Sequence, residues 1–475
     1  MKLQLFLEDR NIMKKFRISG AALAIVALVT MSCSQWIDPK VNIDPNSPAD
    51  AALTNLLLGA EVSVGYTFGG NLNRFSSLLT QHNLGIVRQH DGIGNLYKIL
   101  ESDTESIWNN MYENCMNNLK IMIDKGTETN SPHYRGVARV LMAACLGNLT
   151  DSFGDAPYTK AFQGNGLLQV PYDKQEALYT EIQSLLDAAI VDLGAATSSL
   201  SPGATDDVIY GGGATGRQRW IRAAWLLKAR YALHLSKQNN TQAMQQALTF
   251  AAKGLQSASE DLKVTFVQGA ASNANPLYQF DSQRGDIRVH PNFMTLLNKL
   301  NDPRKSLIVQ TVSGDSTALG KFHASQGSPV LLGTYAEQKF IEAEANLAQG
   351  NADAAKTAFT AAVRASLATY NSTSYGTIAA TAIDAYVAQP SVVPAGAITL
   401  DRIMEQKYIA LYMSNESWVD WRRTALPTLK PATGNAIPRR LPYSQSERLY
   451  NATNWAAAGG SLEQSAIFNR VWWDK

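Results

Sequence analysis

The feature that most constrains the fold of this chain is the recurrence of apolar residues at helical spacing along most of its length. From Trp108 the apolar side chains fall at positions 108, 111, 112, 115, 119 and 122, on one face of a helix with about 3.6 residues per turn. The same periodicity predicts further helices at Tyr134 to Leu149, Glu176 to Leu193, Trp220 to Leu235, Gln242 to Leu255, Tyr335 to Ala348, Ala352 to Ala368 and Arg402 to Met413. We therefore expect a mainly α-helical protein with few short strands.

Several of these helices come in pairs joined by short turns. In the clearest pair, Gly350 and Asn351 separate the two helices, and the second helix carries Ala355, Phe359 and Ala362. This small-large-small spacing lets tetratricopeptide helices pack closely. Four such hairpins predict a short solenoid, which buries a continuous core and leaves one helical surface for a partner. An ordinary helical bundle with alanines at this spacing by chance is the alternative.

Long segments rich in Gly, Asn, Ser and aromatic residues separate the helices: Gly65 to Leu96, Asn165 to Tyr172, Ser257 to Pro291 and Asn371 to Thr399. Long irregular loops in a compact domain are usually functional or disordered. The Tyr and Phe residues in these segments argue against simple disorder. We expect ligand-binding loops here, with insertions near 257–291 and 371–399.

The N-terminus has the pattern of an export signal. Lys14, Lys15 and Arg17 precede an apolar run that ends at Met31, and Cys33 follows Ser32. The apolar run is shorter than the about 20 residues that span a bilayer. Cleavage before a cysteine predicts a lipoprotein signal peptide over 1–32, which is removed, with Cys33 as the lipidated residue. The proline-bearing segment 33–49 suits a tether.

Charge and cysteine content exclude some classes of protein. The chain has 42 basic and 40 acidic residues, of which 1–32 hold five and two, so 37 and 38 remain. This balance argues against a nucleic-acid partner, because phosphate binding needs a clustered positive surface. Cys115 and Cys145 are too few for a disulfide scaffold. We expect two buried free thiols; one disulfide in an oxidising compartment is the alternative.

A glycine motif is the nearest approach to a nucleotide site. Gly211, Gly213 and Gly216 fit a GxGxxG pattern before a helix, but a dinucleotide site needs an acidic residue about 20 positions further on. No Asp or Glu occurs between Asp207 and Glu260. We interpret these glycines as a turn at the start of a helix.

Motifs for catalysis or metal binding are absent from the sequence. It has no HExxH, CxxC, EF-hand loop, Walker lysine or GxSxG elbow. Of the six histidines only His82 and His90 lie close together, and we interpret both as surface loop residues. We predict no enzyme, no cofactor and no metal. A glycoside hydrolase with two facing carboxylates is an alternative that sequence does not exclude.

Short motifs in a definite order carry a family resemblance: Asn42 to Asn46, Ile107 to Tyr112, Leu149 to Tyr158, Ile209 to Gly212 leading to Trp220 to Tyr231, Asn301 to Arg304, Ile403 to Leu411, Glu416 to Arg423 and Ile437 to Tyr443. The chain resembles the SusD/RagB family of outer-membrane nutrient-binding lipoproteins from Bacteroidetes, in particular its branch described as starch-binding associating with outer membrane. Ala156 and Ala425 stand where the family has Ile and Gly.

The resemblance implies a tetratricopeptide-containing helical fold, with 50–475 as a single SusD-like domain. It implies a lipid anchor in the outer membrane, facing the cell exterior, and a lid over a SusC-like TonB-dependent transporter. The captured nutrient would be a glycan or, in some members, an oligopeptide. A surface adhesion or assembly module without transport is a further alternative.

Two of the motifs are interpreted as structural. The charges around Trp418 and Trp421 predict an ion network that fixes a helix end, made by Glu416, Asp420, Arg422 and Arg423. Asp151 and Asp155, with Gly154 and Pro157, predict a tight turn after a helix.

The ligand residues are predicted by loop position. A sugar needs an aromatic ring for its apolar face and polar groups for its hydroxyls, and an extended peptide uses similar rings. In the family, ligand loops follow the first long helix and occupy the middle insertion, here Tyr66 to Tyr97 and Asn275 to His290. The predicted ligand-binding residues are Tyr66, Phe68, Arg88, His90 and Tyr97 in the first segment, and Tyr278, Phe280 and Arg284 in the second.

Overall fold

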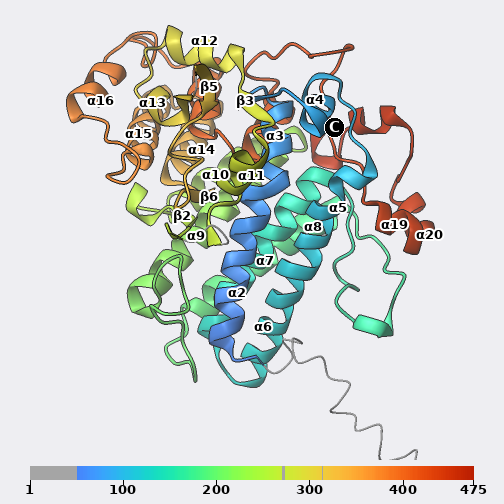
Figure 1. Ribbon diagram of the computed structural model, residues 1–475. Coiled ribbons are helices and arrows are strands. Elements are labelled where there is room, and N and C mark those ends of the chain that lie inside the picture. Colours follow the sequence, from blue (N-terminus) through green and yellow to red (C-terminus); the bar gives the residue numbers. More distant parts are fainter. Residues whose placement is uncertain (1–50, 270–272, 313) are drawn as a thin grey trace, which may run out of the picture. The chain divides into compact units, whose positions relative to one another are not determined.

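Long helices pack in antiparallel pairs to form the body of the protein (Figure 1). The computed structural model describes residues 51–269, 273–312 and 314–475, and Ala52–Lys475 group as one unit. The pairs are α2 (Leu53–Thr67) with α6 (Asn117–Glu128), α7 (Pro132–Phe153) with α8 (Gln175–Leu193), α9 (Gly213–His234) with α10 (Asn240–Ala251), and α14 (Tyr335–Ala348) with α15 (Ala352–Tyr370). Successive pairs touch through α6 and α7, α8 and α9, and α10 and α14. The predicted mainly helical, tetratricopeptide-like architecture is confirmed.

The hairpin of α14 and α15 shows the packing behind the small-large-small sequence pattern. Thr334 caps α14 by accepting a hydrogen bond from the backbone N–H of Glu337. Ala355, Phe359 and Ala362 are all fully buried, with the Phe359 ring 6.1 Å from that of Phe340. The small residues let the two helices approach, and the large one fills the space between them.

The segment around Trp108 departs from the prediction of one regular helix. It consists of α5 (Glu101–Asn109), the π-helical turn η3 (Asn110–Met116) and then α6. A π-turn carries more residues per turn than an α-helix, so the helix continues while its face is rotated. The structure leaves Cys115 and Cys145 as free, buried thiols, as expected.

The predicted irregular loops contain short elements that periodicity cannot detect. The first segment holds the π-helical turn η2 (Phe68–Leu72), α3 (Asn73–Leu79), β1 (Asn83–Gly85) and α4 (Arg88–Asn95). The later segments hold α11 (Pro276–Arg284), β3 (Ile287–Val289) and α16 (Ala380–Val387). β1 and β3 pair antiparallel, with Leu84 opposite Arg288. This two-stranded sheet joins the two segments predicted to bind ligand.

The other elements complete the chain. Two more antiparallel pairs are β2 (Leu262–Thr265) with β6 (Pro329–Gly333) and β4 (Val309–Val312) with β5 (Asp315–Leu319). The remaining helices are α12 (Pro291–Lys299), α13 (Lys305–Ile308), α17 (Leu400–Ala410), α18 (Glu416–Thr424), α19 (Gln445–Tyr450) and α20 (Ala452–Ala457). Short 3-10 turns are η4 (Gly164–Gly166), η5 (Leu235–Lys237), η6 (Ala258–Glu260), η8 (Gln464–Phe468) and η9 (Trp472–Asp474).

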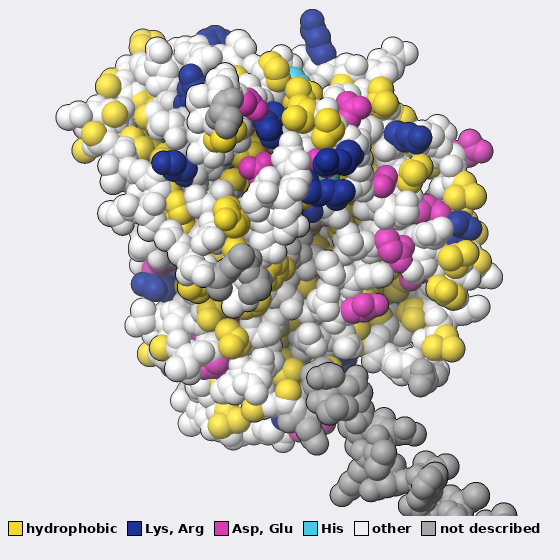
Figure 2. All heavy atoms as spheres, in the orientation of Figure 1, with side chains coloured by type: hydrophobic (Ala, Val, Ile, Leu, Met, Phe, Trp, Pro, Cys, Tyr) yellow, Lys and Arg dark blue, Asp and Glu magenta, His cyan; other side chains and the backbone are white. Residues whose placement is uncertain are grey.

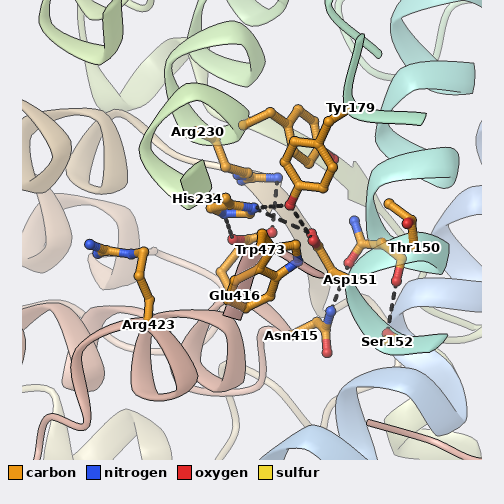
Figure 3. A network of polar contacts seen from close by, with 12 residues as sticks. Thr150, Asp151, Ser152, Tyr179, Arg230, His234, Asn415, Glu416, Arg423 and Trp473 are labelled. Carbon is orange, nitrogen blue, oxygen red and sulfur yellow. Dashed lines mark hydrogen bonds and ion pairs between the residues drawn. The ribbon is translucent and has the colours of Figure 1, made fainter. Parts of the chain in front are cut away.

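A buried ion network ties α18 to the hairpins (Figure 3). Arg230 of α9 forms a bidentate pair with Glu337 of α14, with both N···O distances 2.6 Å, and its Nη1 lies 3.6 Å from Glu416. Arg423 of α18 pairs with Glu344 of α14 and with Asp420. The predicted network is therefore present for Glu416, Asp420 and Arg423, although it joins several helices rather than one helix end, and Arg422 forms no ion pair with another described residue.

The C-terminal tail closes over the same region. The buried guanidinium of Arg422 lies over the ring of Trp418, 3.9 Å from its centroid, and 4.7 Å from that of Trp473. It donates to the backbone oxygen of Asp151 at 2.6 Å. Asp151 lies within the last turn of α7, and Gly154, with φ of +94°, ends that helix, so the predicted turn begins after Asp151 rather than at it.

The structure corrects the interpretation of two histidines. His82 and His90 are 0% and 1% exposed, so their interpretation as surface loop residues is wrong. His82 stacks on Tyr408, with ring centroids 4.1 Å apart, and its Nε2 donates to the Tyr408 carbonyl oxygen.

The predicted signal peptide 1–32, Cys33 and tether 33–49 lie outside the described residues.

The glycine-rich turn before α9 is a helix entry, as interpreted. Gly211, Gly212 and Gly213 have positive φ angles. The backbone N–H groups of Tyr210 and Gly212 donate to the Asp207 carboxylate, at 2.7 and 2.9 Å. The amides that would cradle a phosphate are thus occupied by a side chain of the protein itself.

A close approach of α7 and α9 generates a first prediction. A methyl group at Gly147 would overlap the Tyr231 ring, which lies against the glycine. We expect Gly147→Ala to lower the free energy of unfolding by about 1–3 kcal/mol, because a packed aromatic ring must move. Urea unfolding measures this change.

The matched control is Gly59→Ala in α2, where an added Cβ meets nothing within 4 Å. Because alanine is the better helix former, this variant should gain about 0.5–1 kcal/mol. Equal effects of the two substitutions would contradict the packing of α9 on α7.

Candidate ligand-binding cleft

A cleft of about 380 Å³ opens between the α2–η2–α3 segment, the α5–η3 segment and α11. Tyr66, Phe280 and Arg284 line it, together with Arg74. Its other polar lining residues are Thr67, Asn71, Ser106, Asn110, Gln279 and Gln283. Residues from both predicted ligand segments therefore meet in one site.

Gly69 fixes the wall of this cleft. A Cβ at Gly69 would lie 2.5 Å from Val330 Cγ2 and 2.7 Å from Pro276 Cγ, so only a glycine lets η2 pack against the start of α11. Pro276 is the first residue of α11, and the Asn275 side chain caps it by accepting from the N–H groups of Leu277 and Tyr278.

Phe280 holds an arginine in place inside the cleft. The Arg74 guanidinium lies 4.3 Å from the centroid of the Phe280 ring, a cation–π contact. The His90 ring also packs on Phe280, with centroids 4.7 Å apart. Phe280 is only 9% exposed, so its ring supports Arg74 more than it offers a face to a ligand.

Positive charge dominates the edge of the cleft. The buried Asp286 carboxylate pairs with Arg88 and lies 3.9 Å from Nε of Arg284. Burial and the nearby charge of Arg284 lower the pKa of Arg74 to about 10, so it stays charged at neutral pH. Figure 2 shows a group of Lys and Arg side chains on this face, where α3, α4 and α11 lie in Figure 1.

His90 is the buried neighbour of this charge cluster. Burial, followed by the charge of Arg74, lowers the pKa of His90 to about 4, although Asp286 at 3.4 Å opposes the shift. The imidazole is therefore neutral at physiological pH, and Asp286 faces the arginines without help from a histidine cation.

The other predicted site residues lie away from the cleft surface. Phe68, His90 and Tyr97 are 4%, 1% and 3% exposed, and so present no face to a ligand. Phe68 and His90 are buried because η2 and α4 are packed elements rather than open loops, and the Tyr97 ring packs edge-on against Phe468. The Tyr97 hydroxyl accepts from the N–H of Ala432 at 2.9 Å. Half-buried Tyr278 accepts from Gln326 Nε2 at 3.3 Å and does not line the cleft.

Sequence reasoning missed Arg74 and the cleft amides. Arg74 and Asn71 fall within the segment predicted to bind ligand, three residues apart, and the Arg74 guanidinium donates to Asn71 Oδ1. Their polar side chains on one helical turn beside Tyr66 were the available signal. Gln279 and Gln283, four residues apart, lie on one face of α11, next to the predicted Phe280.

A second groove of about 650 Å³ lies between η3, the segment 157–170 and α19. Its walls are largely aromatic or aliphatic and include Tyr112, Phe162, Leu168 and Tyr450. The Tyr112 hydroxyl donates to the Pro157 carbonyl oxygen at 2.8 Å. Part of its wall comes from the segment Asn165 to Tyr172, which was expected to be a ligand-binding loop, but none of its residues was among the predicted ligand-binding residues.

One cluster has the residue types of a metal site. Ligand atoms of Asp151, His234 and Glu416 lie within 4.8 Å of one another. However, His234 Nε2 is hydrogen-bonded to Glu416 at 3.0 Å and Nδ1 to the Tyr179 hydroxyl at 3.0 Å, and that hydroxyl donates to Asp151 (Figure 3). Both ring nitrogens can donate only if His234 is protonated, so an imidazolium already occupies the place of a cation.

The electrostatics agree with a charged His234. Burial alone would lower its pKa, but the charges and hydrogen bonds of Asp151 and Glu416 outweigh burial and raise the pKa of His234 to about 9. The three residues thus form part of the structural network.

Comparison with known proteins identifies the family. The sequence matches the SusD-like family described as "Starch-binding associating with outer membrane" over residues 45–444. The chain belongs to this SusD-like family, and the sequence-based recognition is confirmed. No protein among the curated sequences matches it. None of the helices in residues 51–269, 273–312 and 314–475 has the length and hydrophobicity of a membrane-spanning segment.

Solved structures agree with the family. A SusD/RagB family protein from Bacteroides thetaiotaomicron is 25% identical with a TM-score of 0.74, covering 89% of this chain and 99% of its own. A chitin-binding SusD homolog from Flavobacterium johnsoniae is 23% identical with a TM-score of 0.72, covering 89% and 97%. A SusD homolog from Bacteroides uniformis is 23% identical with a TM-score of 0.71, covering 90% and 100%. The last two likenesses show the shared fold.

The charge state of His234 generates a pH prediction. Because its pKa is raised from 6.5 to about 9, its stabilisation is complete below pH 6.5 and is lost as the pH rises through 9. We expect the free energy of unfolding to fall over this range by an amount on the order of 3 kcal/mol. Urea unfolding at a series of pH values measures the slope.

His234→Gln is the comparison variant. It should be less stable at neutral pH, because Asp151 and Glu416 lose their cation, and it should lack the decline between the two pKa values. A decline as steep as that of the unmodified protein would assign it to another group.

Proposed function

We propose that this protein is a cell-surface nutrient-capture lipoprotein that binds an oligosaccharide in the cleft between Tyr66 and Arg284. One observation carries the proposal: a half-buried aromatic ring, several amides and guanidinium groups from separate segments line one open cleft. The family described as starch-binding and the chitin-binding structural neighbour support a glycan as the nutrient.

The chemistry of the cleft suits a sugar. Tyr66 packs edge-on against Phe266, with ring centroids 5.1 Å apart, and supplies an aromatic surface for the C–H face of a pyranose. Asn71, Asn110 and Gln283 supply donors and acceptors for hydroxyl groups. A shallow, polar site binds weakly, and weak binding favours release in a delivery step.

Capture without catalysis is part of the proposal. Glycoside hydrolysis uses a pair of carboxyl groups about 5–10 Å apart. Among the described residues that line the cleft, none is acidic. We therefore propose that the protein binds its glycan without cleaving it, and we propose no cofactor.

Location and partner follow from the N-terminus and the family. In this proposal Cys33 is lipidated after removal of 1–32, residues 33–49 act as a tether, and the domain 50–475 faces the exterior of the outer membrane. A SusC-like TonB-dependent transporter receives the glycan. Tyr66, Phe280 and Arg284 remain proposed ligand residues of the cleft, with Phe280 acting through Arg74, whereas Arg88 and Tyr278 are not among the residues that line it.

The surface near α19 favours one alternative function. Leu168, Leu449, Tyr450 and Leu462 are 74%, 56%, 75% and 69% exposed, and Figure 2 shows hydrophobic side chains on the side where α19 and α20 lie in Figure 1. This apolar surface suits a protein contact, either with a transporter or in an adhesion module without transport. An oligopeptide ligand is the other alternative.

The ligand proposal is tested by calorimetry with soluble neutral and acidic oligosaccharides and with oligopeptides. We expect an oligosaccharide to bind, Tyr66→Ala to weaken it at least about tenfold through loss of stacking, and Tyr66→Phe to retain it. Tyr450→Ala, in the second groove, is the matched control. Loss of binding in Tyr450→Ala but not in Tyr66→Ala would move the site to that groove, and binding of peptides alone would reject a glycan ligand.

The anchor is tested by labelling cells with a radioactive fatty acid. We expect the label on the chain and its recovery with the outer membrane, and we expect Cys33→Ser to abolish both, because the thiol is the acylated group. Cys115→Ser controls for thiol loss elsewhere. Membrane recovery of Cys33→Ser equal to that of the unmodified chain would reject the lipid anchor.

A further inference from the structure

We propose that the cleft selects an oligosaccharide that carries a carboxylate, such as a uronic-acid sugar, held between Arg74 and Arg284. This inference rests on the proposed function and names the chemical class of its ligand. It follows from the charges in the cleft, the burial of Arg74 and the side chains that surround it.

The positive charge of the cleft is not balanced by the protein. Within the described part of the chain, Arg74 forms no ion pair; its guanidinium contacts Asn71 and the Phe280 ring. Arg284 approaches Asp286 only to 3.9 Å, and Asp286 also pairs with Arg88. Arg88 and Arg284 therefore share one carboxylate, and Arg74 has none among the described residues.

Arg74 also has unused hydrogen-bonding capacity. Its Nε is inaccessible to solvent and has no acceptor among the described atoms, whereas a buried polar group is usually paired. Burial and the like charge of Arg284 both act against its charged form. An anion between the two arginines would relieve the repulsion and stabilise the charged form of Arg74.

A carboxylate on a sugar fits this arrangement best. A guanidinium binds a carboxylate through two parallel N–H···O bonds, and no acidic side chain among the described lining residues competes for the arginines. Tyr66, Ser106 and the amides offer a ring and groups for hydroxyls rather than a strand edge for a peptide backbone. The cleft is thus complementary to an acidic saccharide.

The experiment is calorimetry on the purified chain with oligogalacturonate and alginate oligosaccharides, each compared with its methyl-esterified, uncharged form. We expect at least one acidic sugar to bind more tightly than its ester, with an affinity that falls as salt is raised. Arg74→Gln and Arg284→Gln should each weaken the acidic sugar by about 10- to 100-fold and leave the ester nearly unchanged. Lys299→Gln, an exposed site on α12, should change neither.

Arg284 is about half exposed, with 52% of its side chain accessible, so we expect Arg284→Gln to fold normally. If Arg74→Gln lowers the melting temperature, the affinity of Arg284→Gln for the acidic sugar still tests the inference. Equal affinity for the charged and esterified forms of every sugar would overturn the carboxylate inference. Binding of a neutral glycan that is lost in Tyr66→Ala would still support the proposed nutrient capture. Arginine-dependent binding of acidic peptides without any saccharide would overturn both.

Discussion

The structure depends on a buried ion network that joins helices from distant parts of the chain. The charged residues of the network are all nearly inaccessible to solvent: Arg230 of α9, Glu337 and Glu344 of α14, and Glu416 and Arg423 of α18. Burying charges is costly, and the cost is offset only if each charge keeps its partner and its geometry. The network therefore tolerates little relative movement of the hairpins, and the protonated His234 completes it between Asp151 and Glu416.

Hydrogen bonds from the start of α18 connect the buried ion network to the wall of the cleft. The backbone N–H of Asn415, directly before α18, donates to Asn73 Oδ1 at 3.1 Å, and Ser417 contacts Thr80 at 3.5 Å. Asn73 opens α3 and precedes Arg74. The helix that presents the cleft arginine is thus fixed to the buried network, while Gly69 fixes the same wall to α11. For the proposed ligand, a site held in this way would need little rearrangement on binding, which would reduce the entropic cost.

Two segments show which parts of the structure could be predicted from the sequence and which could not. The α14–α15 hairpin was predictable because its helices are long, with 14 and 19 residues, and its small-large-small spacing lies on one helical face. The segment 65–97 was not, because η2, α3, β1 and α4 are each eight residues or fewer, too short for periodicity to distinguish from loop. Phe68, His90 and Tyr97 were predicted to bind ligand and are packed instead. Tyr66, Phe280 and Arg284 meet in one cleft, but Arg74 was overlooked.

By itself the amino-acid sequence determined the helical class, the pairing of neighbouring helices and the family, since these depend on local periodicity and on motifs contiguous in the chain. Only the tertiary structure decided which side chains face the cleft and which charges remain unbalanced there. Burial and net local charge are sums over residues far apart in sequence, such as Arg74, Arg284 and Asp286, and no local pattern contains them. The selectivity of the site is consequently a property of the assembled fold.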